Sequence, residues 1–401
     1  MAAAAWLAVF GHRGLAPCAG VMALSVALRR ETWSAGFGLL YSVRRRPTPL
    51  SIAFVAMIAF AVWVALTAFW SPVPGAGWLG LTILVSVLSA GALVFEATRA
   101  SASRARTMAA FYAAMVAIAA MAFLFEGISG AYLRSVIPPE DLTPQRWKDF
   151  IALGRGVTAI APLVFPAAIL LRWMSGSWIV AAAPALALFV AAIKFSIFSN
   201  VIGLIFGAIA FAAALSRPRL SVNLLSALII AALLLAPFAA AQISAASVLD
   251  GDAEYLPTSW AQRLVIWRHT AVLTLDQCLP FGCGADYARA LSEKGVTVGI
   301  PGWPLALPVM PIHPHNLFLQ VWLELGLPGV LAFALALTAS ARALQKAPIG
   351  RSAIAAICAV ASVSFVSVMF EASLWQAWRL AVLALAAFGC AVAYSLEKLR
   401  Q

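Results

Sequence analysis

The segment His313–Gly329, HPHNLFLQVWLELGLPG, decides the fold, because a polar loop ends in it and a membrane helix begins. The run from Leu317 to Thr338 is apolar enough to cross a bilayer. His315 and Asn316 therefore fall where hydrocarbon meets water. Glu324 lies about two and a half turns inside the run, where an ionisable group needs a partner or a wet cavity.

The composition of the whole chain agrees with a membrane protein. Apolar residues make up 63% of it, charged residues only 10%, and the mean hydropathy is +0.95, whereas soluble domains carry about 25% charged residues. Bundled helices satisfy backbone polar groups in lipid, so we predict an all-α polytopic membrane protein. The net charge of +12 does not indicate a nucleic-acid partner, because most Lys and Arg lie in short links between apolar runs.

About twelve transmembrane helices are expected. Ten runs are clear candidates: 50–70, 78–96, 106–126, 150–171, 177–194, 197–215, 221–241, 316–338, 352–371 and 375–395. Residues 2–43 hold one or two more, Leu15–Leu28 and Thr32–Val43, although Arg29-Arg30 between them would lie on the wrong side if both crossed. Pro328, between two glycines, is expected to bend or unwind its helix.

The basic links predict the orientation. If the spans alternate, Arg44–Arg46 and the other basic links all fall on one side, which is the cytoplasm. The opposite, periplasmic side receives the link 71–77, a loop at about 127–149 and a long loop. We therefore divide the chain into an N-terminal transmembrane bundle (1–241), a large structured periplasmic loop (242–314) and C-terminal helices that complete the same bundle (315–401).

The long loop has features of its own. Helical spacing from Trp260 through Trp267 to Leu275 predicts an amphipathic helix with its tryptophans at the membrane interface. Cys278 and Cys283 share one polar segment and could pair in an oxidising periplasm. Asp250-Gly-Asp252 is a possible cation site, but a solvated acidic turn is the favoured interpretation, and we expect no metal or cofactor.

His315 is the first candidate for chemistry, because a neutral imidazole can take a proton from a hydroxyl group. The alternative is a histidine that only bonds the backbone at the helix start. His313, which precedes a proline, is expected to point elsewhere and to support the loop, and Asn316 either caps the helix or orients the His315 ring. Glu324 could pair with a cation or hold a polar network.

Four cations on the outer side are candidates to bind a phosphate or diphosphate: Arg263, Arg155, Lys194 and Arg268. Arginine binds phosphate through two parallel hydrogen bonds, and several cations together can neutralise a leaving diphosphate. The alternative for each is to reach the membrane interface or to pair with an acidic residue of the loops. Arg379, a turn inside the last span, is expected to pair with Glu371.

Two motifs give the chain a resemblance to a known family. His315-Asn316, followed after nine residues by Gly326–Gly329, and Arg263-x3-Trp267, followed by Pro280–Gly284, resemble the bacterial O-antigen ligase and polymerase superfamily of membrane glycosyltransferases. The resemblance implies a GT-C-like fold and metal-independent, inverting transfer of a glycan from undecaprenyl diphosphate to lipid A–core, at the periplasmic face of the inner membrane. It also implies that His315 is the base and Arg263 a diphosphate ligand.

The chain departs from that family at one position. Ser199-Asn200 stands where the family commonly has Ser-Arg, so we expect Lys194 or Arg155 to supply the second cation.

Three alternatives to a ligase are open. A repeat-unit polymerase would share the fold, but polymerases often show Arg-x10-Gly in outer loops, and no outer-face arginine here has glycine at that distance. A protein O-oligosaccharyltransferase is less favoured because we expect no C-terminal domain. A lipid-linked sugar flippase or transporter would need no structured outer loop with a histidine at its edge.

Overall fold

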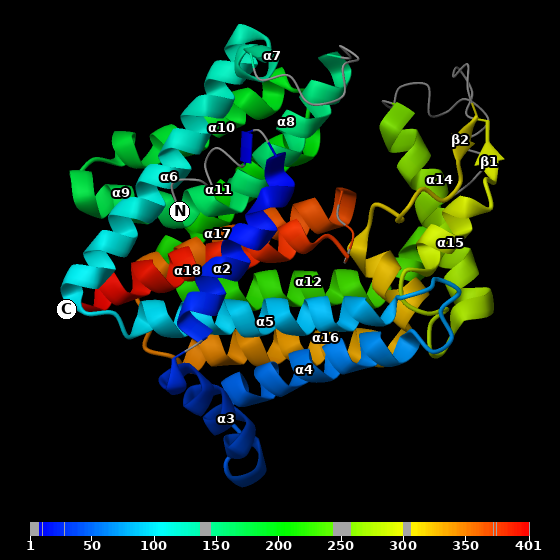
Figure 1. Cartoon of the computed structure of the whole chain (residues 1–401), viewed down its shortest axis with the longest axis horizontal. Coiled ribbons are helices and arrows are strands. Elements are labelled where there is room, and N and C mark those ends of the chain that lie inside the picture. Colours follow the sequence, from blue (N-terminus) through cyan, green and yellow to red (C-terminus); the bar gives the residue numbers. More distant parts are fainter. Residues whose placement is uncertain are drawn as a thin grey trace.

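The computed structural model describes residues 8–9, 11–27, 29–136, 146–243, 258–299, 306–371, 373 and 375–400. Asp250-Gly-Asp252 lies outside these residues. Most of the described chain is helical (Figure 1). The helices are α2 (Leu15–Ala27), α3 (Arg30–Arg45), α4 (Pro49–Thr67), α5 (Gly77–Thr98), α6 (Ala102–Ser129), α7 (Tyr132–Val136), α8 (Arg146–Ile160), α9 (Val164–Ser175), α10 (Trp178–Lys194), α11 (Phe198–Ser216), α12 (Pro218–Ala241), α14 (Thr258–Leu273), α15 (Tyr287–Glu293), α16 (Leu317–Lys346), α17 (Arg351–Phe370) and α18 (Ala377–Lys398).

Nine helices in the described residues are long and apolar enough to cross a membrane. They are α4, α5, α6, the continuous segment Phe150–Ser175, α11, α12, α16, α17 and α18. The prediction of a polytopic helical membrane protein is therefore confirmed, with nine candidate spans instead of about twelve. The expected span 177–194 is α10, an apolar helix of only 17 residues.

The N-terminal helices explain part of the difference between the nine candidate spans and the twelve expected. Arg29, directly before α3, forms an ion pair with Glu96 near the end of α5 (2.8 Å). A short link joins α4 to α5, and the two helices pack together, so the start of α4 lies beside the end of α5. Helix α3 therefore begins and ends at the same side of the bundle. One or two crossings within 2–43 were expected, and α3 does not supply a second one.

The last three helices pack among helices from earlier parts of the chain. Helix α16 packs against α4 and α12, α17 against α11, and α18 against α5 and α2 (Figure 1). These contacts bring the beginning of α16 and the link between α17 and α18 to the same end of the bundle as α14 (Figure 1).

Helix α16 is broken at Gly326, whose φ of 61° and ψ of −161° are not helical. The break lets the carbonyl groups of the preceding turn accept hydrogen bonds from outside the helix: Cys283 N donates to Leu323 O (2.8 Å) and Gly284 N to Glu324 O (3.0 Å). A Cβ atom at residue 326 would lie 2.3 Å from Pro280 O and from Gly282 N. The predicted break near Pro328 is confirmed, and Pro280–Gly284 fits into it.

The described residues 258–299 and 306–314 of the predicted long loop, called the outer segment below, are tied to the bundle at several points. Cys278 and Cys283 form a disulfide bond, as the sequence allowed. Ser71, in the link between α4 and α5, donates to Ala285 O (2.6 Å), so this link and the outer segment share one side. A short antiparallel pair, β1 (Thr297–Val298) with β2 (Leu307–Pro308), leads toward α16.

The tryptophans of α14 contact the end of a candidate span, and their place at the membrane interface stays a prediction. Trp260 and Trp267 pack on Phe370 at the end of α17, with ring centroids 5.5 Å and 5.8 Å from it. Helix α14 packs against α12 and α16. The apolar surface of α14 is thus used to attach it to the bundle.

Candidate functional site

His315 occupies an unusual backbone position directly before α16. The Oδ1 atom of Asn316 accepts hydrogen bonds from Phe318 N (3.0 Å) and Leu319 N (3.2 Å), which makes Asn316 the N-cap. His315 has a φ of 54°, in the left-handed region that few residues other than glycine adopt. Such strain persists only where surrounding structure enforces it, and it is common at functional sites.

The His315 imidazole is held beside His313. The His315 backbone N donates to Nδ1 of His313 (3.2 Å), and the two ring centroids are 4.4 Å apart. His313 thus supports the loop, as the sequence predicted. The expectation that it points elsewhere is wrong, because the hydrogen bond from the His315 backbone to its Nδ1 atom holds the two rings side by side. The Nδ1 atom of His315 is itself buried, and no described residue offers it a hydrogen bond.

The environment keeps the His315 ring neutral. Burial, reinforced by the nearby His313, Arg263, Arg379 and Arg155, lowers the pKa of His315 to about 3. Burial and the charges of Arg379, Arg155 and Arg263 lower the pKa of His313 to about 4. At neutral pH both rings are therefore uncharged, and the charges around them are those of the arginines.

Arg263 is a cation held by backbone carbonyl groups. Its Nε donates to Phe370 O (3.0 Å) and its Nη1 to Ser259 O (2.9 Å). Burial lowers its pKa while the charge of Glu371 opposes that change, and an arginine stays protonated in proteins. No carboxylate in the described residues lies within ion-pair distance of it. Its position is fixed, and its charge has no direct counter-ion there.

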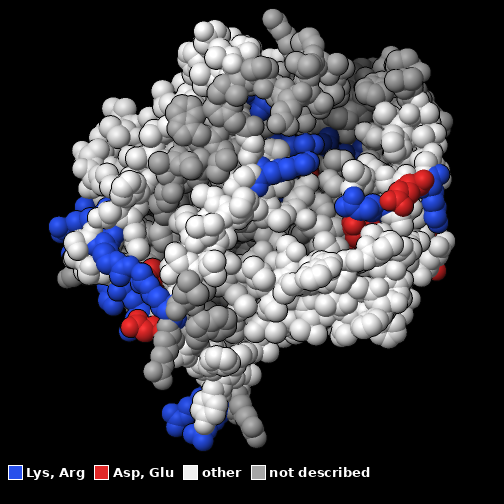
Figure 2. All heavy atoms as spheres, in the orientation of Figure 1, with Lys and Arg blue, Asp and Glu red and all other residues white. Residues whose placement is uncertain are grey.

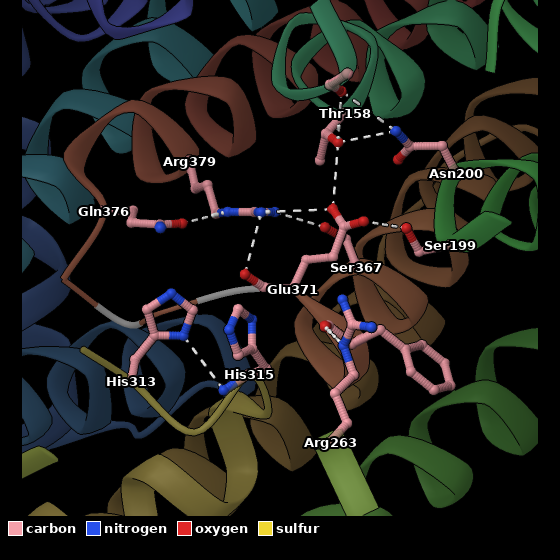
Figure 3. A network of polar contacts seen from close by, with 12 residues as sticks. Thr158, Ser199, Asn200, Arg263, His313, His315, Ser367, Glu371, Gln376 and Arg379 are labelled. Carbon is pink, nitrogen blue, oxygen red and sulfur yellow. Dashed lines mark hydrogen bonds and ion pairs between the residues drawn. The ribbon is translucent and has the colours of Figure 1, made fainter. Parts of the chain in front are cut away.

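Glu371 joins four helices. Its carboxylate accepts hydrogen bonds from Ser199 Oγ and from Thr158 Oγ1 (3.3 Å), and Arg379 Nη2 lies 3.7 Å from its Oε2 atom (Figure 3). The predicted Arg379–Glu371 pair is confirmed. Asn200 donates through Nδ2 to Thr158 Oγ1 (2.9 Å), so the residue that departs from the family pattern belongs to this network.

The structure brings some predicted cations together and leaves others apart. Arg155 is exposed on α8, and its charge acts on both site histidines. Lys194 is exposed at the end of α10, beside Gly127 of α6. Neither Lys194 nor Arg268 of α14 makes a hydrogen bond or ion pair with the site residues described above. Donor binding by these two remains a prediction.

Glu324 holds a polar network, which was one of the two interpretations of its role; the other was pairing with a cation. It is fully buried, and its carboxylate accepts from Asp286 N (2.8 Å), Gln320 Nε2 (3.1 Å) and Trp375 Nε1 (2.8 Å), with a longer bond from Ala288 N (3.4 Å). No cation among the described residues pairs with it. Glu324 thus attaches the outer segment and the α17–α18 link to the start of α16.

The site as a whole is positively charged. Figure 2 shows a band of basic side chains in a hollow between the upper helices and the outer segment. Arg155, Arg263 and Arg379 with Glu371 leave an excess of two positive charges when the histidines are neutral. Within the described part of the chain, no group of three or more His, Cys, Asp or Glu side chains could hold a metal ion.

Fold and site together define a polytopic helical membrane protein with a cation-rich polar site at one end of its bundle. Residues 199–334 match the model of the family described as O-antigen ligase, which is the family that the motifs predicted. A protein of Rickettsia felis named "Putative polysaccharide ligase" is 36% identical over 89 residues, which cover 21% of each chain. No solved structure matches the chain significantly.

Sequence reasoning missed most of the Glu371 network. Thr158, Ser367 and Gln376 were not singled out, and Ser199 was noted only for its place in the family pattern, although polar side chains in or beside apolar helices are a usable signal. The matched family segment contains Arg263 and His315, whereas Arg155, Glu371 and Arg379 lie outside it.

Proposed function

We propose that this protein is an O-antigen ligase-type glycosyltransferase of the bacterial inner membrane. It moves a glycan from undecaprenyl diphosphate to a hydroxyl group of lipid A–core at the periplasmic face. The observation that carries the proposal is the buried, neutral imidazole of His315, on a strained backbone and beside arginines with an excess of positive charge. The family match over 199–334 supports the same class of reaction. A GT-C-like bundle and metal-independent chemistry are parts of the proposal.

The mechanism is a direct displacement. The acceptor oxygen attacks the anomeric carbon of the glycan while Nε2 of His315 takes the hydroxyl proton. The bond between that carbon and the diphosphate oxygen breaks, and the diphosphate leaves with the electron pair. Because attack and departure occur on opposite faces of the carbon, the product is inverted at this centre.

The charges of the site suit this donor. A diphosphate that is esterified at both ends carries two negative charges, equal to the excess positive charge of the site. Arg263 and Arg155 would stabilise the charge that grows on the leaving oxygen. The bound diphosphate would also raise the pKa of His315, since a nearby anion favours the protonated ring. The ring could then hold the proton it receives.

The test is replacement of His315 by Gln in the full-length protein, reconstituted with lipid-linked glycan and lipid A–core. Transfer should fall by about 10²- to 10⁴-fold, which is the usual contribution of a general base. His269→Gln on α14 is the matched control, because His269 is exposed and lies outside the site. Both variants should melt at the temperature of the unmodified protein.

The product identifies the reaction. Mass spectrometry of the acceptor should show a glycan covalently attached to lipid A–core. Extension of the lipid-linked glycan itself would instead indicate a polymerase, and movement of the lipid-linked sugar without a new bond would indicate a transporter. Transfer by the His315→Gln variant at a rate near that of the control would remove the base assignment.

A further inference from the structure

Arg379 is a buried cation that the mechanism above does not use. Neutral groups hold it in place: Gln376 Oε1 accepts from its Nε, Ser367 Oγ from its Nη1 (2.6 Å), and the Glu371 backbone O from its Nη2 (3.4 Å). Its side chain is 14% exposed. An arginine held by neutral acceptors keeps its charge, because these contacts orient the group without neutralising it.

Glu371 balances that charge only in part. Its carboxylate lies 3.7 Å from Arg379 Nη2, which is longer than the 2.7–2.9 Å of a strong charge-assisted hydrogen bond. The direct donors to the carboxylate are the hydroxyl groups of Ser199 and Thr158. Glu371 therefore offsets the guanidinium charge while its own position is set by α8 and α11.

The position of Arg379 relates it to the reacting groups. In Figure 3 its guanidinium group lies across from His313 and His315, and Arg263 lies on another side of the His315 ring. Arg379 comes from α18 and Arg263 from α14, which are separated by more than a hundred residues in the chain. The charge of Arg379 also contributes to the low pKa of both histidines, in agreement with this proximity.

The remaining polar residues of the network carry no positive charge. Asn200 is the family-pattern position at which a second cation was expected, and its amide serves Thr158 and Gly154 O. Lys194, one expected replacement, has no contact with the network in the described residues. Among the described residues, Arg379 is thus the buried cation on the side of the site formed by the Glu371 network.

We propose that Arg379, with Glu371 as its partial counter-charge, forms a second anion subsite that binds one phosphate of a polyprenyl diphosphate while Arg263 binds the other. The inference rests on the proposed function, because it assumes a diphosphate donor. It adds that recognition of the second phosphate comes from α18, outside the segment that matches the family model. The protein should therefore distinguish a polyprenyl diphosphate from a monophosphate through this residue.

The experiment compares two probes, undecaprenyl diphosphate and undecaprenyl monophosphate, bound to the full-length protein in lipid nanodiscs. The unmodified protein should prefer the diphosphate. Arg379→Gln should weaken diphosphate binding by about 10- to 100-fold, which is typical for loss of a charged hydrogen-bonding partner, and should leave monophosphate binding nearly unchanged. Arg379→Lys should retain part of the preference, since it keeps the charge.

Arg106→Gln is the matched control, since it removes one exposed arginine at the opposite end of the bundle and should leave both affinities unchanged. Melting temperatures of all variants establish that they are folded, and Arg379→Lys replaces Arg379→Gln if the latter does not fold. Equal weakening of both probes, or a diphosphate preference that survives the substitution, would overturn the subsite. If the unmodified protein itself shows no diphosphate preference, the donor in the proposed function is wrong.

Discussion

The two histidines show how local sequence and distant charges combine at a single residue. The pattern His-Pro-His-Asn before an apolar run predicts a helix start, and Asn316 indeed caps α16. The left-handed backbone of His315 and the arginines that lower its pKa depend on tertiary structure. Local sequence therefore predicts where the imidazole lies, whereas its protonation state follows from residues as distant as Arg155 and Arg379.

The low pKa of His315 predicts an uncommon pH dependence of transfer. A general base must be neutral, and burial with nearby cations places the pKa of the donor-free protein at about 3. The value of kcat/KM, which reports the free protein, should therefore stay nearly constant from pH 8 to pH 5. On acidification, kcat should begin to fall at a higher pH than kcat/KM does, since a bound diphosphate raises the pKa of the ring.

Both values can be measured from initial rates of glycan transfer in a series of buffers of constant ionic strength. A decline of kcat/KM centred near pH 6.5, the ordinary pKa of histidine, would contradict the environment described for His315. His269→Gln should follow the same pH profile as the unmodified protein, because His269 lies outside the site.

Helix α16 shows, for a whole element, that local sequence predicts a feature while distant residues determine its exact geometry. Its apolar run and the proline between two glycines predicted a broken span, and the break occurs at Gly326, two residues before the proline. The exact position is set by Pro280–Gly284, which donates to the freed carbonyl groups of α16. Proline made a bend probable from sequence alone, but the residue that bends is determined by the loop that fits there.

This fit predicts that Gly326→Ala destabilises the protein. Residue 326 has a positive φ, and an added Cβ would lie 2.3 Å from backbone atoms of Pro280 and Gly282. We expect a loss of about 2 kcal/mol or more in the free energy of unfolding, measured as a lower melting temperature in detergent. Gly91→Ala in α5 is the control, because nothing lies within 4 Å of its added Cβ. Equal melting temperatures for the two variants would show that α16 tolerates the contact.

At the scale of the whole molecule, hydropathy predicted most long helices, and their packing required the structure. Every clear apolar run corresponds to a helix, including the shorter α10. The N-terminal residues were ambiguous because charge and hydropathy disagreed there, and α3 resolves the conflict by beginning and ending on one side. The Glu371 network was not predictable, since Thr158 and Glu371 are 213 residues apart and meet only when α8 and α17 pack.

The arrangement of the bundle predicts which ends face the periplasm. The outer segment and the link between α4 and α5 share one side, and the link between α5 and α6 lies at the other. A cysteine at Lys294, which is exposed after α15, should react with a membrane-impermeant maleimide in intact cells with a permeabilised outer membrane. A cysteine at Arg106 should react only after the inner membrane is disrupted. Labelling in the reverse order would show that the predicted orientation is wrong and that the opposite side faces the periplasm.

The buried Glu324 has a consequence for how the chain is made. Its carboxylate takes hydrogen bonds from three places: Gln320 nearby, the outer segment at Asp286 and Ala288, and Trp375 in the α17–α18 link. A nascent chain that has left the ribosome only as far as α16 still lacks the indole of residue 375. The first turns of α16 thus reach their final environment late in synthesis, and polypeptides truncated before residue 375 would lack one of the donors that hold this acid.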